Sequence, residues 1–426
     1  MRVDLVVKNI GQLVTMAGPP RPRTRKDITE FSIIESGALV ISGGRITGVG
    51  KERILKDFEI QDDTPIIDAG GGCVTPGLVD AHTHAVFCGW REKELALKLK
   101  GYSYMDILQE GGGILNTVEK TRRATEDELI MQGKKSLNRM LAHGTTTIEA
   151  KSGYGLNLEG ELKSLRVLKE LDRTHPVDII PTFLGAHVVP EEYKGNKQDF
   201  VDLVINEMIP EVAAQGLAEF CDVFCEEGVF TIEESRDILL AGRTYGLRPK
   251  LHADELVPFG GAELAAEVGA ATADHLLCSS DAGIKAMVAR GVMGVLLPGT
   301  SFSLMLPHFA PAVKMLEMGL PLALATDFNP GSSPTESLQI IMNLASLKLK
   351  MTPEEVMTAV TINGAYAAGR GDSAGSFEQG KLGDVVIWDA PNIEFLMYHY
   401  GVNLVDKVIK KGVVVVDGGR VLYETC

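Results

Sequence analysis

The feature that most constrains this fold is a series of eight short apolar segments between residues 77 and 326, separated by stretches of helical character. Apolar segments alternating with helices are typical of βαβ units, which build parallel sheets. Eight such units over roughly 250–300 residues favour an α/β fold, the closed (β/α)8 or TIM barrel. The predicted strands are Gly77–His84, Thr145–Ala150, Ile179–His187, Cys221–Glu226, Pro249–Ala253, Ala271–His275, Met293–Leu297 and Pro321–Thr326.

Both ends of the chain show a different pattern, in which short alternating strands are separated by glycine turns. Ala38–Ser42 and Arg45–Val49 are examples near the beginning, and Val413–Val416 is one near the end. Chain termini often lie close together, so one domain can be inserted between two halves of another. We therefore expect residues 1–70 and 380–426 to form a small β-sandwich beside a barrel over residues 71–379.

The first predicted barrel strand ends in two histidines, His82 and His84. Side chains two residues apart share one face of a strand, so both rings can point into the same end of the barrel. Active-site residues of TIM barrels come from the C-terminal ends of the strands, and imidazoles are common metal ligands. This pair predicts a metal site.

The remaining histidines divide into two groups. Three of the nine in the chain, His187, His252 and His275, also lie at the ends of predicted strands, and we expect them at the same site. Four others fall in helical or loop stretches, and we expect them on the surface: His143, His175, His308 and His399.

Two carboxylates complete the predicted chemistry. Asp327 ends the eighth apolar strand, where a metal ion and an attacking water would satisfy its charge. We prefer this role to capping of a helix starting near Ser333. Glu255 follows His252 closely and could transfer a proton to a leaving nitrogen if its pKa were raised, while His275 could polarise a carbonyl or orient the water.

The site is expected to hold a single metal ion. Two-metal barrels of this kind use a lysine on the fourth strand, and the stretch 220–231 contains none. Glu226 could bridge two ions in principle, and Lys151 is interpreted as structural. The long segment from His84 to Thr125, rich in glycine, is predicted to be a substrate lid.

Composition excludes several other classes of function. A net charge of −15 over 426 residues argues against nucleic-acid binding, which needs clustered Lys and Arg. No apolar run reaches the ~18 residues that span a bilayer. Six scattered cysteines with no secretory leader before them indicate a cytoplasmic protein with reduced thiols.

Longer motifs resemble the amidohydrolase superfamily and, within it, the imidazolonepropionase family. The resemblance covers essentially the whole chain. The superfamily motifs are Pro76–His84, His252–Glu255 and Ala325–Gly331. The narrower motifs are Glu110–Ile114, Lys151–Leu156, Phe183–His187 and Asp327–Ser332.

This resemblance implies a homodimeric hydrolase with one divalent ion per subunit, zinc or iron. It implies hydrolysis of 4-imidazolone-5-propanoate to N-formimidoyl-L-glutamate in histidine degradation. The implied metal ligands are His82, His84, His252 and Asp327. The implied substrate contacts are Arg91, Tyr104, Tyr154, His187, Glu255, Asn329, Gly331 and Ser332. A guanidinium such as that of Arg91 suits a propionate, because it binds carboxylates bidentately.

Two other functions remain open at this point. A mononuclear deaminase acting on a purine, a pyrimidine or a formimino group would use the same histidines and Asp327. A barrel that has lost its ligands and acts as a binding or assembly protein would not retain them. The intact ligand set and Glu255 favour an enzyme.

Overall fold

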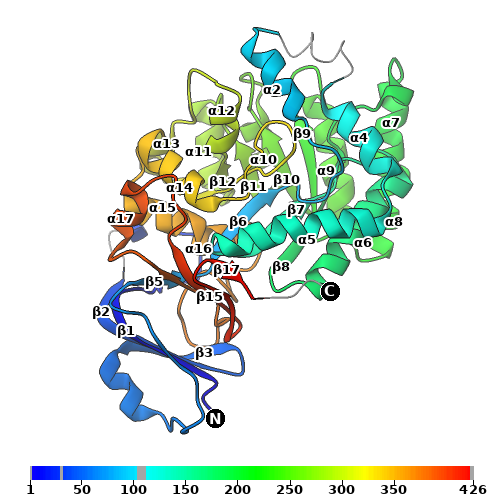
Figure 1. The fold of residues 1–426 in the computed structure, drawn as a ribbon. Coiled ribbons are helices and arrows are strands. Elements are labelled where there is room, and N and C mark those ends of the chain that lie inside the picture. Colours follow the sequence, from blue (N-terminus) through cyan, green and yellow to red (C-terminus); the bar gives the residue numbers. More distant parts are fainter. Residues whose placement is uncertain (1, 29–31, 103–111, 423–426) are drawn as a thin grey trace.

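The computed structural model describes residues 2–28, 32–102 and 112–422. Figure 1 shows a barrel surrounded by helices, with a smaller sheet at one end that contains segments from both ends of the chain. None of the helices in these ranges combines the length and apolarity that crossing a membrane requires.

The barrel sheet has eight parallel strands in sequence order, as the pattern predicts. Each observed strand overlaps the corresponding predicted segment. The strands are β6 (Leu78–Thr83), β7 (Thr145–Lys151), β8 (Asp178–Ala186), β9 (Phe220–Cys225), β10 (Arg248–Ala253), β11 (Thr272–His275), β12 (Met293–Leu296) and β13 (Leu322–Leu324).

The barrel closes where its last strand meets its first. The Asp327 N–H donates to the His82 carbonyl at 3.0 Å, and the His84 N–H donates to the Phe328 carbonyl at 2.8 Å. β13 is shorter than the predicted segment, and Asp327 just beyond it has a positive φ of 51°. The closure places the chain after β13 directly against the two histidines of β6.

Helices surround the barrel and cover its outer face (Figure 1). Between β6 and β9 lie α2 (Glu92–Leu99), α4 (Ile114–Arg123), α5 (Glu126–Ala142), α6 (Leu158–Thr174), α7 (Lys197–Leu203) and α8 (Ile209–Ala214), the last two joined by a π-helical turn over Val204–Met208. Between β9 and β13 lie α9 (Ile232–Thr244), α10 (Gly261–Val268), α11 (Asp281–Arg290), α12 (Pro298–Ser303) and α13 (Ala312–Glu317). After β13 come α14 (Leu338–Leu347), α15 (Pro353–Val360), α16 (Ile362–Ala367) and α17 (Ile393–Tyr398), and the short α1 (Arg25–Ile28) belongs to the first segment.

Helix α5 shows how local sequence sets these helices. Thr125 and Glu128 form a capping box, in which each side chain accepts from the backbone N–H of the other residue. Leu129 and Leu137 are buried on one face. Gly144 follows the helix with a φ of 94°, a conformation that glycine adopts without strain.

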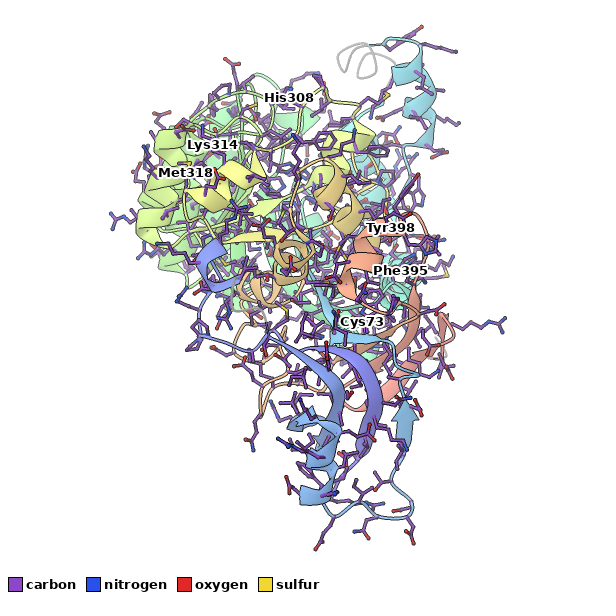
Figure 2. All side chains as sticks on the ribbon, turned by 90° about the vertical axis from the view of Figure 1, so that its left-hand side faces the viewer. Cys73, His308, Lys314, Met318, Phe395 and Tyr398 are labelled. Carbon is purple, nitrogen blue, oxygen red and sulfur yellow. The ribbon has the colours of Figure 1, made fainter. Side chains whose placement is uncertain are left out.

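Both ends of the chain contribute to one mixed nine-stranded sheet. The strands are β1 (Leu5–Val14), β2 (Ile33–Ser42), β3 (Arg45–Lys51), β4 (Ile66–Asp68), β5 (Cys73–Pro76), β14 (Val385–Trp388), β15 (Val405–Lys410), β16 (Val413–Asp417) and β17 (Arg420–Val421). The two ends meet where β5 pairs with β14 in antiparallel orientation. Figure 2 shows Cys73 of β5 at the junction of this terminal sheet and the barrel.

Two local predictions are wrong. His175, expected on the surface, is buried: its Nδ1 accepts from the Val177 N–H at 3.1 Å, and its Nε2 lies 3.0 Å from the Asn138 side chain. Its position between α6 and β8 removes it from solvent. The helix expected near Ser333 begins only at Leu338. His308 and His399 are exposed as expected, and Figure 2 shows His308 on the barrel surface.

Candidate active site

Three histidines come together at the C-terminal ends of the barrel strands. His82 and His84 come from β6 and His252 from β10, and one ligand nitrogen of each lies within 4.8 Å of the others. The Asp327 Oδ1 lies 3.5 Å from the His82 Nε2 and 3.4 Å from the His84 Nε2. All four predicted ligands are therefore buried in one place.

The unpartnered atoms of this cluster fit a divalent metal ion. The His82 Nε2 and the His84 Nδ1 are buried without a hydrogen-bond partner among the described residues. Burying such atoms unpaired is costly, and an ion would satisfy them. Imidazole nitrogens with a carboxylate are a common ligand set for zinc and iron.

Two aspartates orient two of these rings. The His82 Nδ1 lies 2.6 Å from the Asp274 carboxylate, and the His252 Nδ1 lies 3.1 Å from that of Asp222. An ionised carboxylate only accepts hydrogen bonds, so each ring carries its hydrogen on Nδ1. Each Nε2 is left with a free lone pair directed toward the metal site.

Backbone strain concentrates at the same end of the barrel. Asp254, His275, Leu276 and Asp327 all have positive φ values, between 50° and 76°. Residues other than glycine rarely adopt this conformation, and it persists only where surrounding contacts impose it. These positions end β11, directly follow β10 and β11, or lie three residues beyond β13, so the chain turns sharply where it presents functional groups.

Glu255 and Asp327 have pKa values displaced in opposite directions. Burial raises the pKa of Glu255 to about 8, and the nearby Asp327 charge adds to this effect. For Asp327, burial alone would raise the pKa, but the hydrogen bond from His84 and the adjacent histidines outweigh it and hold the value at about 2. One carboxyl group is therefore protonated near neutrality and the other is ionised.

His275 lies beside Glu255, with 3.4 Å between its Nε2 and the Glu255 Oε2. Burial lowers the pKa of His275 to about 3, so the ring is neutral at physiological pH. Neither ring nitrogen has a hydrogen-bond partner among the described residues. The ring is therefore available to a substrate oxygen or a water.

The histidine cluster opens into a cavity of about 440 Å³. Its lining combines residues of the metal site and Glu255 with two cationic side chains, Arg91 and Lys98. Volumes of this order suit a small molecule. A small molecule in this cavity would therefore meet both the cationic side chains and the groups suited to proton transfer.

Comparison with known proteins identifies the family. The chain is 55% identical to an imidazolonepropionase of Alkaliphilus metalliredigens, over 99% of this chain and 100% of the relative. It is 54% identical to an imidazolonepropionase of Shouchella clausii, over 99% of this chain and 95% of the relative. The chain belongs to the imidazolonepropionase family. It is a hydrolase that acts on a carbon–nitrogen bond.

More distant matches agree with this assignment to an amidohydrolase. The amidohydrolase family model matches residues 261–415. An adenosine deaminase from Xanthomonas campestris with bound zinc has a TM-score of 0.70 at 18% identity, over 99% of this chain and 94% of the other. An atrazine chlorohydrolase from Arthrobacter aurescens complexed with zinc has a TM-score of 0.71 at 15% identity, over 99% and 97%. At these identities the likeness shows the fold alone.

In this member of the imidazolonepropionase family, Arg91 lines the cavity. Its Nε donates to the buried Glu94 at 3.0 Å, which fixes the side chain. A Cβ added to Gly331 would lie 2.2 Å from the Arg91 Nη1, so a side chain at this position would displace the guanidinium. Lys98, which the sequence reasoning missed, donates to the Gly331 carbonyl at 3.4 Å.

Tyr154 and His187 form one wall of the cavity. The His187 ring stacks on His84 with centroids 5.2 Å apart, and the Tyr154 ring lies 5.5 Å from His187. The His187 Nδ1 lies 2.9 Å from the Gly153 carbonyl, which can only accept, so its Nε2 is the free acceptor.

Asn329 and Ser332 also line the cavity, but Asn329 is already bonded within its loop. Its amide donates to the Asp327 carbonyl at 2.7 Å, and its oxygen accepts from the N–H groups of Gly331 and Ser332 at 2.9 and 2.8 Å. These bonds shape the loop that supports Arg91.

Other predicted features have mixed outcomes. Tyr104 lies outside the described residues. The predicted lid contains α2 and α4 in its described part, and its role as a lid stays a prediction. Each Glu226 oxygen accepts a backbone hydrogen bond, from Glu227 and Leu256 respectively, and the single metal ion stays a prediction.

Asp222 and Asp274 were also missed, although a signal was present. Each is a lone acidic residue in an apolar strand segment, and a buried charge of this kind requires a partner. The pairing could not be predicted because Asp222 lies 30 residues from His252 in the sequence and Asp274 lies 192 residues from His82.

Proposed function

We propose that this chain hydrolyses the ring amide of 4-imidazolone-5-propanoate to N-formimidoyl-L-glutamate, a reaction of histidine degradation. The observation that carries the proposal is the combination of groups that line one cavity. Arg91 and Lys98 suit the propionate carboxylate, while Glu255, His275 and Asp327 suit the chemistry at the ring.

A divalent ion held by His82, His84, His252 and Asp327 would lower the pKa of a bound water and polarise the ring carbonyl. His275 is neutral and unpartnered, so it can donate to the carbonyl oxygen as negative charge develops there.

Two carboxyl groups divide the proton transfers between them. Asp327 is ionised and accepts a proton from the attacking water. Glu255 is protonated near neutrality and donates a proton to the departing ring nitrogen. A carbon–oxygen bond forms and the carbon–nitrogen bond of the ring breaks. Return of a proton from Asp327 to Glu255 restores both groups, so that over the full cycle one proton of water stays on the new carboxyl group and the other is gained by the released nitrogen.

The direct test uses purified protein and synthetic 4-imidazolone-5-propanoate. We expect loss of the ring's ultraviolet absorbance and formation of N-formimidoyl-L-glutamate without ammonia. Ammonia release would instead indicate a deaminase. An absence of turnover by both zinc-loaded and iron-loaded protein would contradict the proposal.

Three finer features belong to the same proposal. The ion is zinc or iron, which metal analysis of the purified protein distinguishes. The homodimer and the cytoplasmic location are predictions from the family resemblance and the cysteine pattern. Light scattering of the purified protein tests the first, and fractionation of the native cells tests the second.

A further inference from the structure

A buried lysine lies beneath the histidine cluster. Lys151 is the last residue of β7, and its side chain has no exposed surface. Its ammonium nitrogen lies 2.9 Å from the Glu149 carboxylate, 2.7 Å from that of Asp222 and 3.8 Å from that of Asp274. A buried lysine with three acidic neighbours has a role beyond filling space, because desolvating these charges is costly.

Two of these neighbours are the aspartates that orient the histidines. Asp222 accepts from His252 with Oδ1 and forms its ion pair with Lys151 through Oδ2. Asp274 contacts both the His82 ring and Lys151 with Oδ2. Lys151 therefore contacts the carboxylates that orient two predicted metal ligands, His252 and His82.

The barrel geometry explains this convergence. Lys151, Asp222 and Asp274 come from β7, β9 and β11, whereas His82 and His252 come from β6 and β10. Side chains inside a TIM barrel form layers contributed by alternate strands. One layer therefore contains the charged residues, and it supports the rings contributed by the intervening strands.

We propose that Lys151 is a positioning residue for the metal site. By holding the carboxylates of Asp222 and Asp274 in place, it fixes the orientation of the His82 and His252 rings and so determines metal affinity. Without the ammonium, both aspartates lose the cation that contacts their carboxylates directly and move to find other partners. The rings that they orient then lose a single defined geometry.

Lys250 is the matched control. It is equally buried and also comes from the barrel interior, but it contacts the Glu149 carboxylate at 3.7 Å and the Ala81 carbonyl at 3.3 Å. The described residues include no ion pair between Lys250 and either aspartate. Replacing it removes the same charge from the same core without breaking a direct contact to either aspartate, so it controls for the loss of charge alone.

The test compares zinc affinity of Lys151→Met and Lys250→Met, measured by competition with a chelator on folded apo-protein. We expect Lys151→Met to lose about 10–100-fold in affinity, as for other residues that orient metal ligands, and Lys250→Met to lose less than about threefold. Equal losses, or unchanged affinity in folded Lys151→Met, would overturn the proposal. The inference rests on the metal site of the proposed function and not on its substrate. Zinc affinity is therefore measured independently of whether the protein hydrolyses the imidazolone.

A double variant keeps the test decisive if Lys151→Met does not fold. Combining Lys151→Met with Asp222→Asn removes one charge of each sign and leaves the core better balanced. If Lys151 acts through Asp222, adding Lys151→Met to the Asp222→Asn protein lowers zinc affinity by less than adding it to the wild type does. If the single variant does not fold, the comparison is with the loss of about 10–100-fold expected for it. A full additional loss of about 10–100-fold would refute action through Asp222.

Discussion

At the scale of single residues, the proposed chemistry depends on Glu255 being protonated. Its pKa of about 8 results from burial and from the charge of Asp327. A general acid works in its protonated form, which is present below the pKa and lost above it. Activity should therefore decline as the pH rises through about 8.

Replacing Glu255 with Gln should lower kcat by about 10²–10⁴-fold, because the proton donor to the ring nitrogen is lost. Zinc content should not change, because Glu255 is not among the proposed ligands. Steady-state kinetics across the pH range, together with metal analysis, check both statements. Glu227→Gln is the control, since that side chain is exposed and is not among the groups that shift the pKa of Glu255, so it should keep the wild-type pH profile. Unaltered turnover by Glu255→Gln would exclude the proton-transfer role.

Arg91 makes a separate prediction about binding. Replacing it with Ala should raise KM by about 10–100-fold, since a charge-assisted hydrogen bond contributes about 1.5–3 kcal/mol. Gly331→Ala should have the same direction of effect, because the added Cβ would displace the guanidinium. Kinetics with the imidazolone measure both. Lys93→Ala is the control, because it removes a charge from the exposed face of α2, which begins directly after Arg91, and should leave KM unchanged. An unchanged KM in Arg91→Ala would indicate that another residue binds the substrate carboxylate.

At the scale of elements, one side chain in the loop between β10 and α10 bonds to four successive backbone N–H groups. The Asp254 carboxylate accepts from the N–H groups of Phe259, Gly260, Gly261 and Ala262 at 2.9–3.1 Å. These bonds cap the first turn of α10 and fix the loop that carries the neighbouring catalytic glutamate.

Asp254→Ala should therefore lower the free energy of unfolding by about 3 kcal/mol or more, because several partly buried N–H groups lose their acceptor together. It should also lower kcat. Thermal unfolding and kinetics measure the two effects. Ser279→Ala, which removes one bond to the same carboxylate, should have a much smaller effect on both. Equal effects from the two substitutions would argue against Asp254 as the organiser of the loop.

At the scale of the whole molecule, the terminal sheet is joined to the barrel by charged as well as apolar contacts. Lys410 of β15 contacts Asp178 of β8 at 2.7 Å and also forms an ion pair with Asp384. Trp388 of β14 is buried in the same apolar cluster as Leu78 of β6. These contacts hold the sheet against the base of the barrel, opposite the active site.

The Asp178 pair makes stability depend on pH. Burial alone would raise the pKa of Asp178, but Lys410 and Lys411 outweigh it and lower the value. A lowered folded-state pKa gives stability that is present above the unfolded-state value of about 3.9 and is lost as the pH falls toward the folded-state value.

Asp178→Asn should therefore lower the free energy of unfolding by about 1–3 kcal/mol at neutral pH, and its difference from the wild type should shrink below about pH 4. Urea unfolding at neutral pH and below about pH 4 measures this difference. Asp406→Asn is the control: it breaks an ion pair with the partly exposed Lys407 on the same sheet and should change the free energy of unfolding by less than about 1 kcal/mol. A difference that stays constant with pH would contradict the ion-pair explanation.

The sequence by itself determined the parts of this protein that depend on local patterns. Eight apolar segments predict the barrel strands, because alternation of strand and helix is readable over a few residues. The spacing of His82 and His84 places both rings on one face of a strand for the same reason. Asp327 and Glu255 followed from their positions after strand ends.

Only the tertiary structure decided which distant residues meet. Closure of the barrel brings Asp327 to the histidines of β6, and the alternating layers bring Lys151 between two aspartates from other strands. Lys98 reaches the cavity only because α2 packs beside the loop containing Gly331. His175 is buried for a similar reason. A charge in one strand carries no local sign of its partner in another, so these pairings depend on contacts far apart along the chain.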